Sequence, residues 1–124
     1  MKLLIVLLLI LAVPVTSQAK KWYEGGTLHN ASALVWQNAR YENKLATCSD
    51  IIVTAWKNHY FKPELQSKLT SLDSVKLLAN ELVKALDIAF SREADPNKNK
   101  MMYTNQTVSD SAALLMVMMG WVDL

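Results

Sequence analysis

Hydrophobic residues after position 19 recur at the spacing of α-helices, and the one β-like run, Ile51–Val53, is too short to form a sheet. The clearest periodicity lies between residues 72 and 90, where apolar residues three or four positions apart share one helical face. This face is formed by Val75, Leu78, Ala79, Leu82, Leu86, Ala89 and Phe90. Glycine and proline, which interrupt helices, are scarce after residue 19. We therefore expect an all-α fold.

Polar residues of the kind that cap helices predict where the helices begin. Residues 27–30 precede a first helical segment, and Thr47-Cys48-Ser49-Asp50 fits a capping box with Asp in place of Glu. The residues expected to be buried after this start are Ile51, Ile52, Ala55 and Trp56. This helix should end near His59, and whether residues 30–59 form one helix or two stays open. Two further starts are predicted at residues 70–73 and 107–110, with a polar surface loop between residues 91 and 106.

The C-terminal helix is apolar on almost every side. Its apolar residues are Ala112, Ala113, Leu114, Leu115, Met116, Val117, Met118, Met119 and Trp121. A helix that is apolar all round must be surrounded by other elements. We therefore predict a small bundle of four to five helices with this helix at its centre. Its methionines are predicted to fill the core rather than to form an adaptable binding surface.

The first nineteen residues have the pattern of a secretory signal peptide. Met1-Lys2 precedes an apolar run from Leu3 to Val13, and a polar stretch then ends in Ser17-Gln18-Ala19. The run is shorter than the ~20 apolar residues that a membrane span needs. We expect cleavage after Ala19, which leaves residues 20–124 as one helical domain in the periplasm or outside the cell.

The charge of the chain excludes some classes of partner. The 13 Lys and Arg residues, of which Lys2 lies in the signal peptide, nearly balance the 11 Asp and Glu residues, and the signs alternate along the chain. Nucleic-acid binding requires a clustered basic face, which this pattern lacks. No apolar stretch after residue 19 is long enough for stable membrane insertion. The expected partner is therefore another protein.

The chain has few residues that could carry chemistry. Cys48 is the only cysteine, so no internal disulfide can form, and we expect a small buried side chain. The alternatives for Cys48 are a free reactive thiol, an intermolecular disulfide, or the nucleophile of a thiol-dependent enzyme. His29 and His59 lack the spacing of a metal site, and no nucleophile-elbow motif is present. We predict no catalytic residue, metal or cofactor.

Aromatic residues outside the predicted core mark a candidate partner-binding segment. Residues Lys20–Gly26 are expected to form an extended N-terminal arm that carries Trp22 and Tyr23 beside Gly25 and Gly26. Tryptophan and tyrosine are enriched at protein interfaces. The alternative is that the arm is a strap packed across a groove of the bundle.

Two segments resemble small, exported, all-helical acid-stress chaperones of the HdeA type. Thr47-Cys48-Ser49-Asp50-Ile51 is similar to the segment that holds their first cysteine, and residues 81–87 resemble the helix that holds the second. Ala85 takes the place of that second cysteine, so the disulfide of the family is missing here. The resemblance implies a periplasmic helical protein that loosens in acid and binds unfolding clients.

The sequence thus favours an exported, non-enzymatic protein–protein interaction module that works as an inhibitor, an immunity-like protein or an accessory protein. The first alternative is an acid-responsive holdase. Below the ordinary carboxylate pKa of ~4, repulsion among Lys and Arg would loosen the bundle and release the apolar C-terminal helix. The second alternative is an enzyme that uses Cys48.

Overall fold

The computed structural model describes residues 19–123, so the predicted signal peptide lies outside the described residues except for Ala19. Within this range the chain forms six helices and no strands, which confirms the all-α prediction. The helices are α1 (Ala33–Gln37), α2 (Tyr41–Lys57), α3 (Pro63–Lys68), α4 (Leu72–Ala89), α5 (Pro96–Tyr103) and α6 (Val108–Met118). The count exceeds the expected four to five because α3 and α5 are short helices in segments without apolar periodicity.

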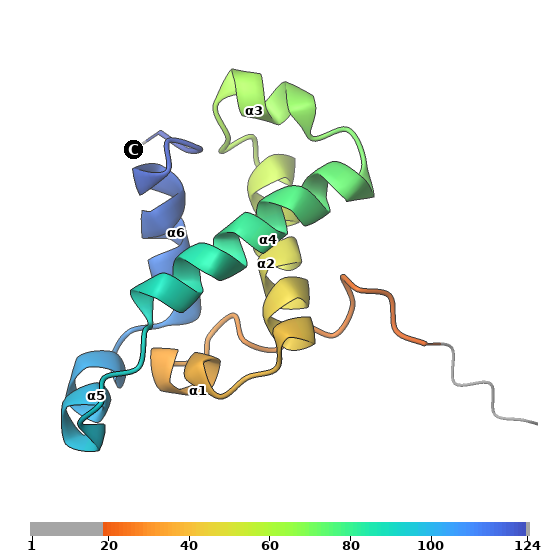
Figure 1. The fold of residues 1–124 in the computed structure, drawn as a ribbon. Helices are drawn as coiled ribbons and strands as arrows, with labels where there is room; N and C mark the ends of the chain where they lie inside the picture. The colour runs from red at the N-terminus through yellow and green to blue at the C-terminus, as the bar shows by residue number, and fades with distance from the viewer. Residues whose placement is uncertain (1–18, 124) are drawn as a thin grey trace, which may run out of the picture.

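The core of the molecule lies where α4 crosses α2 (Figure 1). Both helices turn an apolar stripe toward this crossing, with fully buried Cys48 and Ile52 on α2 and fully buried Ala79, Leu82 and Leu86 on α4. Burying such side chains stabilises the fold by roughly 1.5–3 kcal/mol each. Trp56, which was expected in the buried stripe of α2, is instead 40 % exposed.

Trp36 confirms the expectation that it belongs to the core. It is 1 % exposed on α1, and its indole N–H donates to Asp87 Oδ1 at 2.9 Å. Lys44 Nζ lies 2.8 Å from the same carboxylate oxygen and 5.2 Å from the centroid of the Trp36 ring. A buried indole whose N–H is satisfied in this way joins α1, α2 and α4.

The predicted helix start at Thr47 is wrong. Residues 30–59 form two helices, but the break falls at residues 38–40, and α2 runs without interruption through Thr47. The Thr47 hydroxyl accepts a hydrogen bond from the backbone N–H of Leu28 at 3.2 Å. This residue type is therefore explained by a contact with the segment before α1 and not by a helix cap.

The two other predicted helix starts are confirmed within one residue. Ser71 caps α4, and its hydroxyl and that of Ser74 each accept from the other's backbone N–H, at 3.2 and 3.1 Å. Thr107 caps α6, because its hydroxyl accepts from the backbone N–H of Asp110 at 3.3 Å. Reciprocal caps of this kind satisfy backbone donors that a helix leaves free.

The prediction of a loop over residues 91–106 is wrong, because this segment contains α5. Asp95 accepts from the backbone N–H of Asn97 at 3.0 Å, and Pro96 takes the first helical position, which suits its fixed backbone angle. Tyr103 of α5 packs edge-on against Phe90, which packs edge-on against Trp36, with ring centroids about 6 Å apart. This aromatic contact attaches α5 to α1 and to the end of α4.

Helix α6 does not lie at the centre of the bundle, which corrects the sequence prediction. Only Val108, Ala112 and Met116 are buried on it, whereas Leu114 and Met118 are 60 % and 71 % exposed. Figure 1 shows α6 at one side of the molecule, next to the crossing of α2 and α4. The prediction that the methionines fill the core holds for Met116 and fails for Met118.

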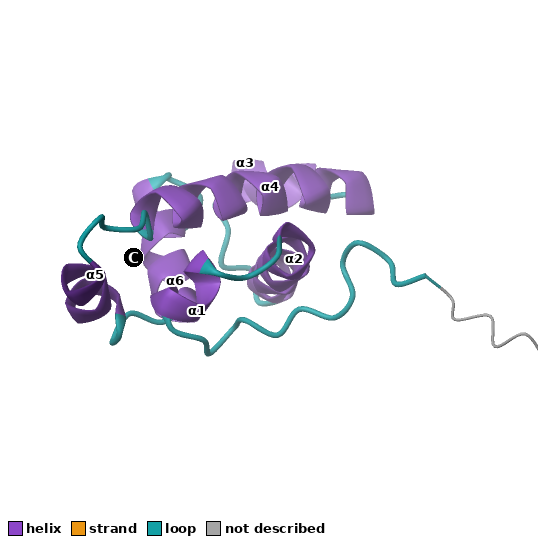
Figure 2. Cartoon of the chain, turned by 60° about the horizontal axis from the view of Figure 1, so that its bottom comes forward, coloured by secondary structure: helices purple, strands orange, loops and turns teal. Residues whose placement is uncertain are grey.

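The start of α6 is held by the segment before α1. The backbone N–H groups of Val108 and Ser109 donate to the carbonyls of Ala31 and His29, and that of Ala33 donates to Gln106, at 2.8–3.1 Å. Figure 2 shows the resulting arrangement, with α4 on one side and α1, α2 and α6 on the other. Residues near the two ends of the described chain therefore lie side by side.

Candidate functional site

The N-terminal arm is fixed to α2 by side-chain hydrogen bonds. The Asn43 side chain pairs with Thr27, accepting from its backbone N–H at 2.9 Å and donating to its hydroxyl at 2.7 Å. Thr47, one turn further along α2, accepts from Leu28. Because α2 satisfies the backbone donors of Thr27 and Leu28, the residues that directly follow the arm are fixed at this helix.

The two glycines of the arm permit a sharp turn and a close approach. Gly25 has a φ of +82°, a conformation that other residues adopt at a cost of roughly 1–2 kcal/mol. A Cβ atom on Gly26 would lie 2.6 Å from the backbone nitrogen of Thr47, which is closer than any real contact. The arm therefore ends directly against the α2 backbone, at Gly26.

Trp22 and Tyr23, the aromatic residues that the sequence singled out, are packed against each other at the end of this arm. Their ring centroids are 5.3 Å apart with an interplanar angle of 85°, the edge-to-face geometry that aromatic pairs prefer. Lys76 Nζ of α4 lies 5.4 Å from the centroid of the Trp22 ring. Both aromatic side chains are half-buried, so they are held in place and still accessible.

A groove of about 520 Å³ separates the arm from the start of α2. It is lined by Lys20, Lys21, Trp22, Glu24, Gly25, Thr27, Arg40, Glu42 and Asn43. Within residues 19–123, neither Arg40 nor the two lysines form an ion pair. Figure 1 shows the arm near the N-terminal end of α2. The groove is thus lined by the aromatic Trp22, by three basic side chains and by the acidic Glu24 and Glu42.

A second site, a hollow of about 310 Å³ between α2 and α6, was not predicted from the sequence. It is lined by His29, Asp50, Ile51, Thr54, Ala55, Tyr60, Ser109, Ala113 and Met116. His29 Nε2 and Asp50 Oδ2 are 2.9 Å apart, and both side chains are partly exposed. No motif predicts this pair, because the two residues are 21 positions apart and the capping-box pattern accounted for Asp50.

His29, Asp50 and Ser109 line the same hollow, but they do not form a catalytic triad. The Ser109 hydroxyl donates to the backbone carbonyl of His29, and the backbone N–H of Ser109 donates to the same carbonyl at 3.1 Å. A triad requires the hydroxyl to bond to the imidazole ring itself. Ser109 therefore positions His29 in this structure and is not activated by it. His59, the other histidine, lies outside this hollow.

Cys48 is fully buried, as the sequence led us to expect. Burial raises the pKa of the Cys48 thiol far above its ordinary value of 9.0; the Asp87 carboxylate adds to this, and Lys44 opposes it. Because the thiolate is the reactive form, this environment suppresses nucleophilic chemistry. Among residues 19–123, no group of three or more His, Cys, Asp and Glu side chains is placed to hold a metal ion.

Compared with protein-family models, curated proteins and solved structures, the chain has no match. The resemblance to chaperones of the HdeA type therefore stays a prediction. In the part of the chain that the structure describes, none of the helices has the length and apolarity needed to cross a membrane.

Proposed function

We propose that residues 20–124 act outside the cytoplasm as a non-enzymatic protein–protein interaction module of the inhibitor, immunity-like or accessory kind. One observation carries this proposal: Trp22 and Tyr23 pack edge to face next to a groove that is also lined by Arg40. Tryptophan, tyrosine and arginine are the residue types that most often dominate the binding energy of interfaces. The burial of Cys48 further supports a non-enzymatic function.

The way the arm is held also supports binding through this surface. An interface loses free energy when it must order flexible side chains, and pre-ordered groups avoid much of that loss. Hydrogen bonds of Thr27 and Leu28 with Asn43 and Thr47, together with the close approach of Gly26, fix the end of the arm at α2 before any partner arrives. A flexible strap without these contacts would bind more weakly with the same residues.

The test is an affinity capture with mature Lys20–Leu124 as bait in periplasmic extract at pH 7, followed by affinity measurement with the purified partner. We expect one stoichiometric protein, whose dissociation constant rises about 30-fold for Trp22→Ala, as for a typical hot-spot residue. Trp56→Ala is the matched control, because Trp56 is also partly exposed but does not line the groove. Deletion of residues 20–26 without any loss of affinity would contradict the proposal.

An acid-responsive holdase is the second candidate, and the exposed apolar face of α6 favours it. Leu114 and Met118 already face solvent in the folded state. Two contacts that join distant segments, the His29–Asp50 hydrogen bond and the Lys44–Asp87 ion pair, depend on ionised carboxylates. We expect the near-ultraviolet circular dichroism to collapse between pH 4 and pH 2 if this candidate is right. A native spectrum at pH 2 would eliminate it.

A further inference from the structure

The hollow between α2 and α6 has an apolar wall and a polar end. Ile51, Ala55, Ala113 and Met116 contribute to the wall, and His29 with Asp50 forms the polar end. Its volume of about 310 Å³ is at the lower end of the range for small ligand sites. A few polar groups that converge on an apolar hollow are the usual features of such a site.

The polar end offers hydrogen-bond acceptors. An ionised carboxylate cannot donate, so the proton between His29 Nε2 and Asp50 Oδ2 is carried by the imidazole. In the neutral ring, Nδ1 is then an acceptor. Within the described residues, neither His29 Nδ1 nor Asp50 Oδ1 makes a hydrogen bond, and with a neutral imidazole the pair has the single negative charge of the carboxylate. This combination suits a ligand that is a donor and positively charged.

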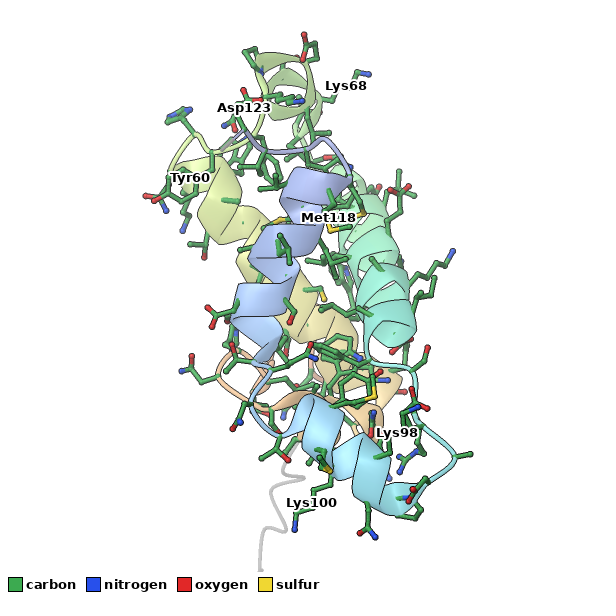
Figure 3. All side chains as sticks on the ribbon, turned by 90° about the vertical axis from the view of Figure 1, so that its left-hand side faces the viewer. Tyr60, Lys68, Lys98, Lys100, Met118 and Asp123 are labelled. Atoms are coloured by element: carbon green, nitrogen blue, oxygen red, sulfur yellow. The ribbon has the colours of Figure 1, made fainter. Side chains whose placement is uncertain are left out.

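The two acceptor groups are fixed before any ligand arrives. Asp50 lies in the middle of α2, and the carbonyl of His29 is held by the backbone N–H and hydroxyl of Ser109 at the start of α6. Tyr60, just beyond α2, also lines the hollow and is 61 % exposed, so its ring is available to a cation. Figure 3 shows Tyr60 beyond the C-terminal end of α2, with α6 running alongside that helix.

We propose that this hollow binds an ammonium or guanidinium group carried on a short apolar stem. The stem lies against Ala113 and Met116, and the cation donates to Asp50 Oδ1. A free alkylamine and the side chain of lysine or arginine share this chemistry. The site does not include the arm, so it stands independently of the function proposed above.

The first experiment compares three probes of equal length at pH 8, n-pentylamine, n-pentanol and n-pentanoate. Binding is followed by the NMR signals of ¹³C-labelled methionine methyl groups. Met116 in the wall is the reporter, and Met101, which is 84 % exposed on α5, is the internal control. We expect pentylamine to shift the Met116 signal and to bind about tenfold more tightly than pentanol, with no binding of pentanoate. Equal affinities for amine and alcohol, or equal shifts at Met101, would overturn the proposal.

Substitution of the charged residue locates the site. Asp50→Asn keeps an acceptor for the His29 N–H but removes the negative charge, and it should weaken pentylamine binding about tenfold. Asp110→Asn is the matched control, because Asp110 is an exposed carboxylate on α6 that does not line the hollow. Asp50 is 46 % exposed in its side chain, so the variant should fold, which circular dichroism would verify. Unchanged pentylamine affinity in folded Asp50→Asn would refute the assignment.

A fourth probe distinguishes the sources of the cation. Nα-acetyl-lysine N-methylamide presents the lysine side chain as a protein would, with its backbone blocked. Binding as tight as that of pentylamine assigns the hollow to lysine side chains of a protein partner. Binding of pentylamine alone assigns it to small free amines. Binding of neither probe rules out the site.

Discussion

Gly26 lies against the backbone of α2 at Ala46 and Thr47, where a side chain of any size would collide with main-chain atoms. The absence of a side chain at Gly26 therefore allows the end of the arm to contact α2. The neighbouring Gly25 serves a different purpose, since its positive φ sets the turn. The sequence placed both glycines in an extended arm but did not predict this contact, because the approach of two distant backbones leaves no local pattern.

Gly26→Ala should destabilise the protein by about 1–3 kcal/mol, because the added methyl group forces the arm away from α2. Urea denaturation would measure this loss, and faster quenching of Trp22 fluorescence would show that the arm has moved. Gly120→Ala is the comparison for the opposite case: a Cβ there would meet only Lys62 Nζ, at 3.9 Å, so its cost comes from the positive φ of Gly120, which Gly26 lacks. Stability equal to the wild type in Gly26→Ala would show that the close approach does not exist in solution.

Cys48 should make the protein sensitive to alkali. The folded state holds the thiol pKa above its ordinary value of 9.0, so above pH 9 the unfolded chain loses a proton that the folded chain keeps. The free energy of unfolding is therefore unaffected by this group below pH 8 and falls with rising pH above pH 9, by at most about 1.4 kcal/mol per pH unit.

The contribution of Cys48 is isolated by comparing wild type with Cys48→Ala in urea denaturation from pH 7 to pH 10.5. Lysine and tyrosine titration is common to both proteins, so the difference between their slopes reports the thiol. Parallel curves would disprove the effect. Iodoacetamide should also label folded wild type slowly, and rapid labelling would reopen the hypothesis of an enzyme that uses Cys48.

At the scale of elements, α5 shows how a helix without an apolar stripe is held in place. Asn99 is 6 % exposed and exchanges hydrogen bonds with the amide of Gln37 on α1, at 3.0 and 2.8 Å. The Asn99 carbonyl oxygen also accepts from the backbone N–H of Glu93 at 3.0 Å. A buried polar network of this kind positions α5 through hydrogen bonds as well as through the aromatic contact of Tyr103.

Asn99→Ala should lower the free energy of unfolding by about 1–3 kcal/mol, because the backbone N–H of Glu93 and one N–H of the Gln37 amide lose their partner, while the other still donates to the Phe90 carbonyl. Hydrogen exchange of the α5 amides would increase more than that of α2. Asn97→Ala is the control, since Asn97 is an exposed asparagine on the same helix. Equal effects of the two substitutions would mean that the network contributes nothing specific.

A helix could be predicted where residues close together in the sequence determine its ends and its buried face. The start of α4 at Ser71 and that of α6 at Thr107 follow from neighbouring residues, and the structure has both. Helix α5 was missed because its cap at Asp95 was interpreted as a turn and its buried Asn99 gives no apolar signal. The prediction that α6 is buried on every side was wrong. Its composition shows only that apolar residues occur on every face of the helix, whereas the positions of the neighbouring helices determine which face is buried.

At the scale of the whole molecule, the class of fold followed from the sequence and the positions of the two sites followed only in part. The arm with Trp22 and Tyr23 was identified because glycines and aromatics stand next to each other in the chain. The pairing of His29 with Asp50 was not predictable, because it arises where α6 brings the segment before α1 against α2. Contacts between residues that are far apart in sequence can be identified only in the folded structure.

Residues 20–124 should unfold in one cooperative transition, because α2 and α4 share a single core to which the other helices attach. Thermal unfolding of the mature chain, followed by far- and near-ultraviolet circular dichroism, would give coincident curves. Two separated transitions would contradict a single domain.

The pairing of residues 29–33 with residues 106–109 has a consequence for biogenesis. A chain that crosses a membrane with its N-terminus first, as the proposed export requires, delivers residues 29–33 early and their partners almost last. Bringing together two segments so far apart in sequence costs conformational entropy and slows folding. Until the two segments pair, the apolar residues of the first segment stay exposed. Under the proposed export, the newly translocated chain therefore passes through a stage in which residues 29–33 lack their partners, and a chain that stops before residue 106 would lack them permanently.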